Sequence, residues 1–284
     1  MLTVLEAIQL STEYLEKKGI ESPRLNAELL LADILNCKRF DLYLQFDKPI
    51  KEEEKNRYRK YLERRGNFEP IQYVLGYCDF YGLKLNLNTS VLIPRPETEL
   101  LVETVIENVN PNDKVRILDV GTGSGNISIA LAKNLSDIEI TAIDISNEAI
   151  EIAKANAELN LVQNKINFSN IDINKFVLEK SDKFNFVVSN PPYVSRVDYP
   201  TLQKEIVQYE PEIALTDNSD GLEFYRIISK IANEILITNG KLFFEIGLGQ
   251  SEKVKEIMSE NKFTNIYIKK DYSKIDRIIF GEKE

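Results

Sequence analysis

The part of the chain from residue 113 onward alternates between short apolar runs and amphipathic segments, and this alternation limits the possible folds more than any other feature. Segments with helical spacing separate most of the apolar runs, which favours a mostly parallel sheet with helices on both faces. The last two runs have no helix between them, so we expect one antiparallel strand. The seven predicted strands are KVRILDV, IEITAID, KINFSN, FNFVVSN, KLFFEIG, FTNIYIKK and IDRIIFG.

The residues before this region have a different pattern. Apolar residues with helical spacing in residues 1–76, a Ser22-Pro23 pair typical of a helix start, and a charged run that stops near Gly66 predict a small helical domain. Alternating apolar residues around Gly82 predict a β-hairpin. We therefore expect three parts: a helical domain (1–76), a hairpin linker (77–93) and an α/β domain (94–284).

Composition removes several classes of function. The chain has 284 residues, no histidine, and two cysteines, Cys37 and Cys78, that form no C-x-x-C pair. Ser-His-Asp and Cys-His catalysis are therefore excluded, and we expect neither a metal site nor a disulfide.

The net charge of −9 disfavours nucleic acid as a partner. The acidic N-terminus is unlike a signal peptide, and no run approaches the roughly 20 apolar residues of a membrane helix, so we expect a cytoplasmic protein without a membrane partner.

A glycine-rich loop joins the first predicted strand to the next helix. Glycines allow a sharp turn and the close approach of a ligand, which in such sheets binds outside the carboxyl ends of the strands. A dinucleotide fingerprint requires G-x-G-x-x-G, but Asn126 stands at the last position, and the G-K-[ST] of a P-loop is absent. A plain strand-to-helix turn is a further interpretation. The loop reads Asp119-Val120-Gly121-Thr122-Gly123-Ser124-Gly125.

An acidic residue, Asp144, closes the second predicted strand. A carboxylate at this position can accept hydrogen bonds from both hydroxyls of a ribose. Together with the acid two residues before Gly121, it favours a nucleoside cofactor, and the tight glycine spacing favours S-adenosylmethionine over a dinucleotide. The sequence thus predicts a methyltransferase domain of the seven-stranded, Rossmann-like class.

The most specific motif is Asn190-Pro191-Pro192-Tyr193, which follows the fourth strand. The prolines fix the backbone and donate no N–H, so carbonyl groups in this turn stay free to accept. The Asn190 side-chain oxygen and the Pro191 carbonyl can accept both hydrogens of one NH2 group, and Tyr193 offers an aromatic face to a flat group. A proline-rich loop without function is the alternative interpretation.

This arrangement suits methyl transfer to a planar nitrogen. The lone pair of an amide or exocyclic amine is delocalised, which makes the nitrogen a poor nucleophile. Two acceptors that hold its hydrogens orient the lone pair and stabilise the positive charge that develops as the methyl group arrives. No strongly basic side chain is needed, in keeping with a chain that has no histidine. We predict that Asn190, Pro191 and Tyr193 are catalytic.

Several segments of the chain resemble the HemK-type family of release-factor glutamine methyltransferases. The resemblance covers nearly the whole chain and implies methylation of the N5 amide nitrogen of the glutamine in the Gly-Gly-Gln motif of peptide chain release factors. It also implies that the helical domain helps to recognise the release factor. The segments are PIQYVLGYCDFYG, VLIPRPETELLVE, ILDVGTGSGNISIALA, AIDIS, VVSNPPYV, YEPEIAL and DGLEFYR.

The resemblance also implies roles for single residues. Gly121 to Gly125 line the cofactor, Asp144 holds its ribose, and Asp172 lies near the adenine. Asn190 to Tyr193 grip the glutamine, and Asn190 also touches the cofactor. Many relatives have a tryptophan directly after the acid that corresponds to Asp172; here Ile173 follows, so only apolar contact with the adenine is expected.

The role of one segment and the choice among several functions stay open at this point. PRPETE (94–99) is expected either beside the active site or as a helix start, with Pro96, Glu97 and Glu99 in the first turn. A DNA adenine-N6 methyltransferase uses the same tetrapeptide but needs a basic recognition domain. A glutamine methyltransferase of ribosomal proteins and a non-catalytic binding module are two more candidates. We expect a monomer that acts on release factors.

Overall fold

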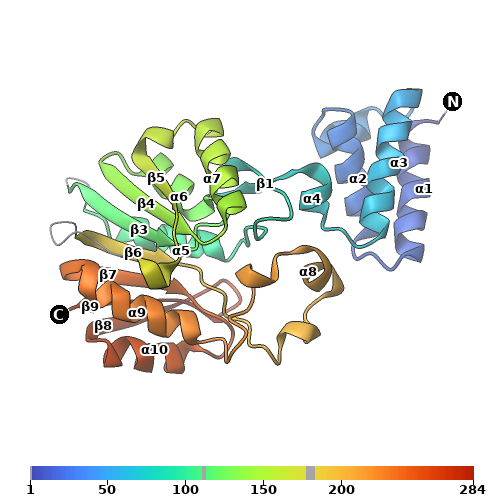
Figure 1. Ribbon diagram of the computed structural model, residues 1–284. Helices are drawn as coiled ribbons and strands as arrows, with labels where there is room; N and C mark the ends of the chain where they lie inside the picture. The colour runs from blue at the N-terminus through green and yellow to red at the C-terminus, as the bar shows by residue number, and fades with distance from the viewer. Residues whose placement is uncertain (1, 111–112, 177–182) are drawn as a thin grey trace. The chain divides into compact units, whose positions relative to one another are not determined.

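The structure is a computed structural model that describes residues 2–110, 113–176 and 183–284 (Figure 1). The chain divides into two compact units. The smaller unit contains the residues up to Tyr77 together with Gln203–Tyr209, and the larger unit contains Cys78–Leu202 and Glu210–Glu284. No helix in the described ranges is both long enough and apolar enough to cross a membrane.

The smaller unit is built from helices, as predicted for the start of the chain. Its first helix begins at a capping box: the Thr3 hydroxyl accepts a hydrogen bond from the Glu6 N–H, and the Glu6 carboxylate accepts one from the Thr3 N–H. Buried residues such as Leu30 and Leu31 form its core. The elements are α1 (Val4–Lys17), α2 (Pro23–Ile34), η1 (Arg39–Leu44), α3 (Glu52–Gly66) and α4 (Ile71–Leu75).

A short helix from the second half of the chain completes this unit. α8 (Lys204–Tyr209) lies between elements of the larger unit in sequence but groups with the smaller one. Arg65 forms an ion pair with Glu205 at 2.9 Å, and the Tyr209 hydroxyl donates to the Asn67 backbone oxygen at 2.9 Å. We did not predict α8 from the sequence, because a helix of 6 residues carries little periodicity.

After α4 the chain forms the predicted β-hairpin, which turns at Gly82 with φ of 72°. Seven further strands then form one sheet. The hairpin strands are β1 (Tyr77–Phe80) and β2 (Leu83–Asn86). The strands of the sheet are β3 (Val115–Val120), β4 (Ile138–Asp144), β5 (Ile166–Asn170), β6 (Phe184–Ser189), β7 (Leu236–Glu245), β8 (Phe263–Lys270) and β9 (Asp276–Lys283).

The strand order in this sheet is β5-β4-β3-β6-β7-β9-β8. The pairs from β5 to β7 are parallel, whereas β9 runs antiparallel to both of its neighbours. The prediction of a mostly parallel seven-stranded sheet with one antiparallel strand is confirmed. The strand order reverses direction at β3, and in such sheets a ligand-binding crevice forms at the carboxyl ends of the strands beside this point.

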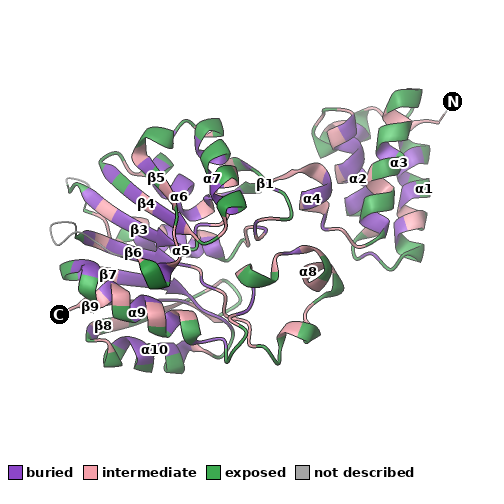
Figure 2. Cartoon of the chain, viewed as in Figure 1, coloured by how far each residue is buried: buried purple, intermediate pink, exposed green. Residues whose placement is uncertain are grey.

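Helices cover both faces of the sheet (Figure 1). Neighbouring residues of one strand point to opposite faces, so Ile117 packs in the core cluster under α5, α6 and α7, while Leu118 packs in the cluster under α9 and α10. Figure 2 shows the buried strands between these layers. The helices are α5 (Thr98–Glu107), α6 (Asn126–Asn134), α7 (Asn147–Leu159), α9 (Glu223–Ile235) and α10 (Ser251–Glu260), with short turns η2 (Gln163–Lys165), η3 (Ile173–Lys175), η4 (Tyr199–Thr201) and η5 (Glu212–Ala214).

Candidate active site

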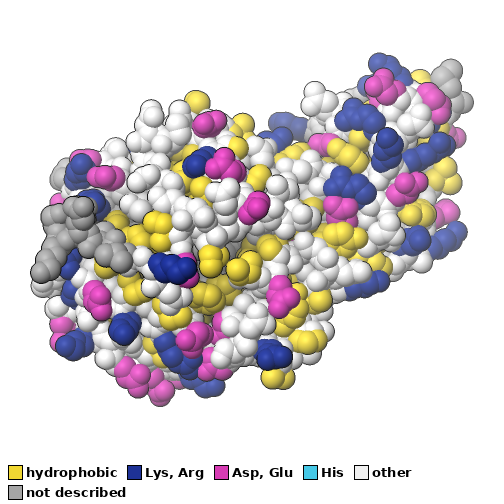
Figure 3. Space-filling model, viewed as in Figure 1, with side chains coloured by type: hydrophobic (Ala, Val, Ile, Leu, Met, Phe, Trp, Pro, Cys, Tyr) yellow, Lys and Arg dark blue, Asp and Glu magenta, His cyan; other side chains and the backbone are white. Residues whose placement is uncertain are grey.

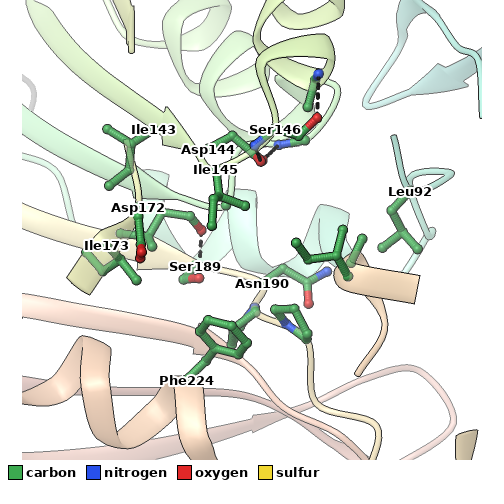
Figure 4. Close-up of a pocket in the computed structure, with 18 of the residues that line it drawn as sticks. Leu92, Ile143, Asp144, Ile145, Ser146, Asp172, Ile173, Ser189, Asn190 and Phe224 are labelled. Atoms are coloured by element: carbon green, nitrogen blue, oxygen red, sulfur yellow. Dashed lines mark hydrogen bonds between the residues drawn. The ribbon is translucent and has the colours of Figure 1, made fainter. Parts of the chain in front are cut away.

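A cavity of about 230 Å³ lies in the larger unit at the carboxyl ends of the parallel strands. Figure 4 shows Asp144 and Ile145 on one side, Asp172 and Ile173 on another, and Asn190 with Phe224 opposite Asp144. In Figure 3 hydrophobic side chains gather around a hollow in the middle of this unit's visible face. The cavity lies where the strand order predicts it and brings together residues from distant parts of the chain.

The glycine-rich loop forms one wall through its backbone. Gly121 and Gly123 both line the cavity, with φ of 72° and 55°, a conformation that side-chain-bearing residues rarely adopt. Gly125 shares this conformation, with φ of 81°, and a Cβ there would also lie 2.9 Å from Ile129 Cδ1 and 3.2 Å from Ala153 Cβ. The loop therefore needs its glycines both for its turn and for close packing on α7.

A buried carboxylate supports this loop from behind. The hydroxyls of Thr122 and Ser128 both donate to Oδ2 of Asp119, at 2.7 and 2.6 Å. Burial raises the pKa of Asp119 to about 6, against the lowering effect of the two hydroxyl bonds. Thr122 and Ser124 are themselves buried, so of the predicted loop residues Gly121 and Gly123 face the cavity.

Asp144 ends β4 and lines the same cavity. Its two oxygens accept hydrogen bonds from the backbone N–H groups of Gly123 and Ser146, each at 2.9 Å. Burial raises the pKa of Asp144, whereas these backbone bonds lower it. A carboxylate has about four acceptor positions, so Asp144 has the capacity to accept further hydrogen bonds from ligand hydroxyls.

The remaining walls are mainly apolar. Asp172 follows β5 and is fixed by the backbone N–H of Asn174 at 2.9 Å, a bond that lowers its pKa. Ile173 also lines the cavity. Phe224 on α9 adds an aromatic ring that we did not predict, although the DGLEFYR motif contains it. Ile173 and Phe224 thus give the cavity an apolar and an aromatic surface in a chain that contains no tryptophan.

The tetrapeptide after β6 divides between the cavity and the core. Asn190, Pro191 and Pro192 line the cavity. The Asn190 side-chain nitrogen donates to the Thr98 hydroxyl at 3.2 Å. The Tyr193 ring packs on the apolar core instead, and burial raises the pKa of its hydroxyl to about 12. Its backbone oxygen accepts a hydrogen bond from Gln250 at 2.9 Å, which fixes the turn.

The PRPETE segment turns out to be both a helix start and part of the site's support. α5 begins at Thr98, so Glu99 lies in its first turn, whereas Pro96 and Glu97 precede it. Arg95 forms an ion pair with Glu210 at 2.5 Å and thereby ties this segment to the YEPEIAL motif.

Thr98 and Glu245 stand behind Asn190 and were not predicted from the sequence as site residues. The Thr98 hydroxyl donates to a Glu245 carboxylate oxygen at 2.6 Å. A signal for Glu245 was present, because it is the only charged residue in the apolar run from Leu242 to Leu248.

Comparison with known proteins gives matches in both parts of the chain. Residues 6–76 match the family model of the PrmC N-terminal domain, and residues 96–217 match that of the methyltransferase small domain. A release factor glutamine methyltransferase of Fusobacterium nucleatum is 43% identical over 281 residues, which is 98% of this chain and 78% of the relative. Its counterpart in Geobacter sulfurreducens is 38% identical over 98% of this chain and 96% of the relative.

Solved structures resemble the fold at lower sequence identity. A methyltransferase from Pyrococcus furiosus aligns with a TM-score of 0.53 at 19% identity and covers 71% of this chain and 89% of its own. A ribosomal protein L11 methylase from Lactobacillus delbrueckii subsp. bulgaricus aligns with a TM-score of 0.50 at 22% identity, over 68% of this chain and 82% of its own. These likenesses support the methyltransferase fold. The sequence matches over nearly the full length show that the chain belongs to the family of release factor glutamine methyltransferases.

Proposed function

We propose that this protein transfers a methyl group from S-adenosylmethionine to the N5 amide nitrogen of the glutamine in the Gly-Gly-Gln motif of peptide chain release factors. One observation carries the proposal beyond family membership: the Asn190-Pro191-Pro192 turn lines the same cavity as Asp144 and the glycine loop. The residues proposed to bind the amide and those proposed to bind the nucleoside therefore line one cavity.

The residues around the cavity fit S-adenosylmethionine. Gly121 and Gly123 leave room for close approach of the ligand, and Asp144 offers carboxylate oxygens to ribose hydroxyls. Ile173 and Phe224 offer apolar surface to the adenine, with Asp172 at its polar edge. When bound, the cofactor supplies an electrophilic methyl group on a positively charged sulfur. We propose that Gly121, Gly123, Asp144 and Asp172 bind it, with Thr122, Ser124 and Gly125 shaping the loop.

The proposed work of the chain at the amide is orientation. The Asn190 side-chain nitrogen is taken by Thr98, so the Asn190 oxygen is available to accept one hydrogen of the substrate NH2. The Pro191 carbonyl accepts the other hydrogen. Pro192 has no N–H, so it offers no donor in this turn that would compete with the substrate NH2 for an acceptor. Holding both hydrogens turns the nitrogen lone pair toward the methyl group, and such preorganised contacts stabilise the developing charge.

The Tyr193 position bears on the details of this proposal. Its ring packs on the apolar core, and its backbone oxygen is held by Gln250. We therefore propose that Tyr193 supports the turn from behind, while stacking of its ring on the glutamine stays a prediction.

The rest of the proposal concerns partners and place. The smaller, helical unit matches the PrmC N-terminal domain model, and we propose that it contributes to binding the release factor. Since release factors act with ribosomes, the reaction belongs in the cytoplasm. A monomer remains our expectation. A glutamine of a ribosomal protein is the second candidate substrate, because the same grip on an amide would serve it, and DNA adenine is the third.

Mass spectrometry tests the substrate directly. Purified release factor is incubated with this protein and S-adenosylmethionine, and the tryptic peptide with the Gly-Gly-Gln glutamine is measured. We expect one added methyl group on that glutamine. Ribosomal proteins and duplex DNA are incubated in parallel under the same conditions. Equal or faster labelling of either one, or an unmodified release-factor peptide, would contradict the proposed substrate.

A further inference from the structure

Two buried side chains, Thr98 and Glu245, stand behind the proposed amide-binding turn and are joined to Asn190 by hydrogen bonds. The Asn190 nitrogen is 3.2 Å from the Thr98 hydroxyl oxygen, and that oxygen is 2.6 Å from Oε2 of Glu245. Thr98 is the first residue of α5 and Glu245 the last residue of β7, and each is only 1% exposed. β7 pairs in parallel with β6, which leads into Asn190, so these hydrogen bonds link adjacent strand ends through the start of a helix.

The hydrogens available on these three side chains determine which group donates and which accepts in each hydrogen bond. An ionised carboxylate only accepts, so Thr98 must give its single hydroxyl hydrogen to Glu245. The Thr98 oxygen can then only accept from Asn190, and the Asn190 atom that faces it must be nitrogen. The orientation of Asn190 thus follows from the hydrogens alone and does not require the two ends of an amide to be told apart by shape. The Asn190 oxygen is consequently left as the free end of the side chain.

We propose that Thr98 and Glu245 are positioning residues, which lock Asn190 with its oxygen toward the substrate amide. This inference rests on the proposed function, because it gives the free oxygen its partner. If Asn190 turned over, its NH2 group would face the NH2 group of the glutamine, and two donors cannot bond to each other. The hydrogen bonds from Asn190 through Thr98 to Glu245 thus select the orientation of the Asn190 amide in which its oxygen faces the substrate.

The charge on Glu245 makes the lock sensitive to pH. Burial raises the pKa of Glu245 to about 7, while the Thr98 hydrogen bond and the charge of Arg277 act in the opposite direction. The other groups that act on it are Glu97, which raises its pKa, and Arg95, which lowers it. The hydroxyls of Tyr193 and Tyr225 are also near but stay neutral, because their own pKa values are raised by burial.

Protonation would reverse the direction of the hydrogen bonds. When the proton binds Oε2 of Glu245, the oxygen that faces Thr98, this O–H donates to the Thr98 oxygen, and the Thr98 hydrogen then turns toward Asn190 and needs an acceptor there. Asn190 satisfies it by presenting its oxygen to Thr98, which leaves its NH2 group toward the substrate. We therefore expect the methyl-transfer rate of the wild-type protein to fall as the pH drops through about 7.

Substitution of Thr98 tests whether its hydroxyl orients Asn190 or whether its side chain only packs in the core. Thr98→Val keeps the shape but removes the hydroxyl, and we expect single-turnover transfer at saturating S-adenosylmethionine to slow about 10- to 100-fold. Thr98→Ser should regain most of that loss. Thr104→Val is the matched control: Thr104 is equally buried on α5, but among the described residues its hydroxyl donates to the Leu100 backbone oxygen and to no other group, so the rate of this variant should match wild type. Equal rates for both valine variants would overturn the proposal.

A double substitution asks whether Thr98 acts through Asn190. In an Asn190→Ala background, Thr98→Val should cause little further loss, because the side chain that it orients is gone. The full 10- to 100-fold loss in that background would show that Thr98 acts elsewhere. Glu245→Gln keeps an acceptor oxygen but has no titrating charge, so its rate should lose the inflection near pH 7 that the wild type shows. An inflection that persists in Glu245→Gln would also overturn the proposal.

A readout without substrate separates this proposal from the proposed function. The side-chain NH2 signals of Asn190 are assigned in the ¹H–¹⁵N spectrum by their disappearance in Asn190→Asp. With S-adenosylmethionine alone, they should shift with a midpoint near pH 7 in the wild type and stay constant in Glu245→Gln. If they titrate but release factor stays unmethylated, the proposed substrate is wrong and the lock stands. If release factor is methylated but the signals do not titrate, the lock is wrong.

Discussion

The two sides of the cavity are held in different ways. On the glycine-loop side, Asp144 is fixed by backbone N–H groups, one of them only 2 residues away and the other 21 residues away. On the tetrapeptide side, Asn190 is fixed by side chains: Thr98 is 92 residues from it, and Glu245 is 147 residues from Thr98. The first side is held by backbone N–H groups, and the second by side chains from three separate segments.

This difference has consequences for substitution. Backbone donors stay in place when side chains change, so the glycine-loop side should respond mainly to loss of Asp144 itself or of a glycine. A series of hydrogen-bonded side chains loses its orientation when any one of them is replaced, because each hydrogen bond sets the direction of the next. Substitutions on the two sides should therefore separate these behaviours.

The largest effect is expected on the glycine-loop side. Asp144→Ala should weaken S-adenosylmethionine binding, since two charge-assisted hydrogen bonds to the ribose, each of about 1.5–3 kcal/mol, would be lost. Calorimetric titration measures this, with Asp144→Asn as the control that keeps one acceptor oxygen and should lose less. Unchanged affinity in Asp144→Ala would mean that the ribose binds elsewhere, and equal affinity for NAD would contradict the choice of cofactor.

The next effect concerns the tetrapeptide side. Asn190→Ala should slow single-turnover methyl transfer at saturating cofactor by about 10²–10³, or about 3–4 kcal/mol, because one preorganised acceptor is removed. Cofactor affinity should fall only modestly, in contrast to Asp144→Ala. Asn190→Asp keeps an acceptor and should retain more activity than Ala. A rate within a few-fold of wild type for Asn190→Ala would show that Asn190 does not grip the amide.

A pair of glycines tests how rigidly the tetrapeptide side is held. Gly221 and Gly249 have φ of 78° and 77°, so alanine is strained at both, by about 1–2 kcal/mol. A Cβ on Gly221 would also lie 2.4 Å from the Tyr193 backbone oxygen, whereas the described residues leave the space around Gly249 open. Gly221→Ala should therefore destabilise by about 1–3 kcal/mol more than Gly249→Ala in urea unfolding. Equal losses would mean that the turn yields without cost.

The smallest effect concerns the carboxylate behind the glycine loop. Burial raises the pKa of Asp119 to about 6, above its ordinary value of 3.8. The folded state thus binds this proton more tightly than the unfolded state, so the stability that Asp119 contributes is present in acid and is lost as the pH rises toward about 6.

Asp119→Asn provides the comparison. Its amide oxygen keeps an acceptor for Thr122 and Ser128 but does not titrate. The unfolding free energy of the variant relative to wild type should increase by on the order of 1 kcal/mol per pH unit between about pH 4 and pH 6, and then level off. A difference that is constant across this range would mean that Asp119 is not strained by its burial.

Much of the fold was predictable because its signals are local. Each strand of the sheet is a short apolar run, and each helix after it has its own periodicity, so the seven strands and the single antiparallel one follow from the sequence. α8 was not predicted, because its place depends on Arg65 and Asn67, which lie far from it in sequence. Residues 204–209 carry no pattern that says which unit they join.

The candidate site also has a part that local sequence signals determine and a part that depends on long-range packing. The amino-acid sequence by itself determined the glycine turn, the acid at the end of β4 and the rigid Asn190-Pro191-Pro192 turn, because glycine and proline act on their own backbone and a strand end is a local feature. Only the tertiary structure decided that Phe224 faces the cavity, that the Tyr193 ring turns to the core, and that Thr98 and Glu245 stand behind Asn190. These contacts depend on which strand ends lie side by side, and that is set by packing of the whole sheet rather than by any one segment.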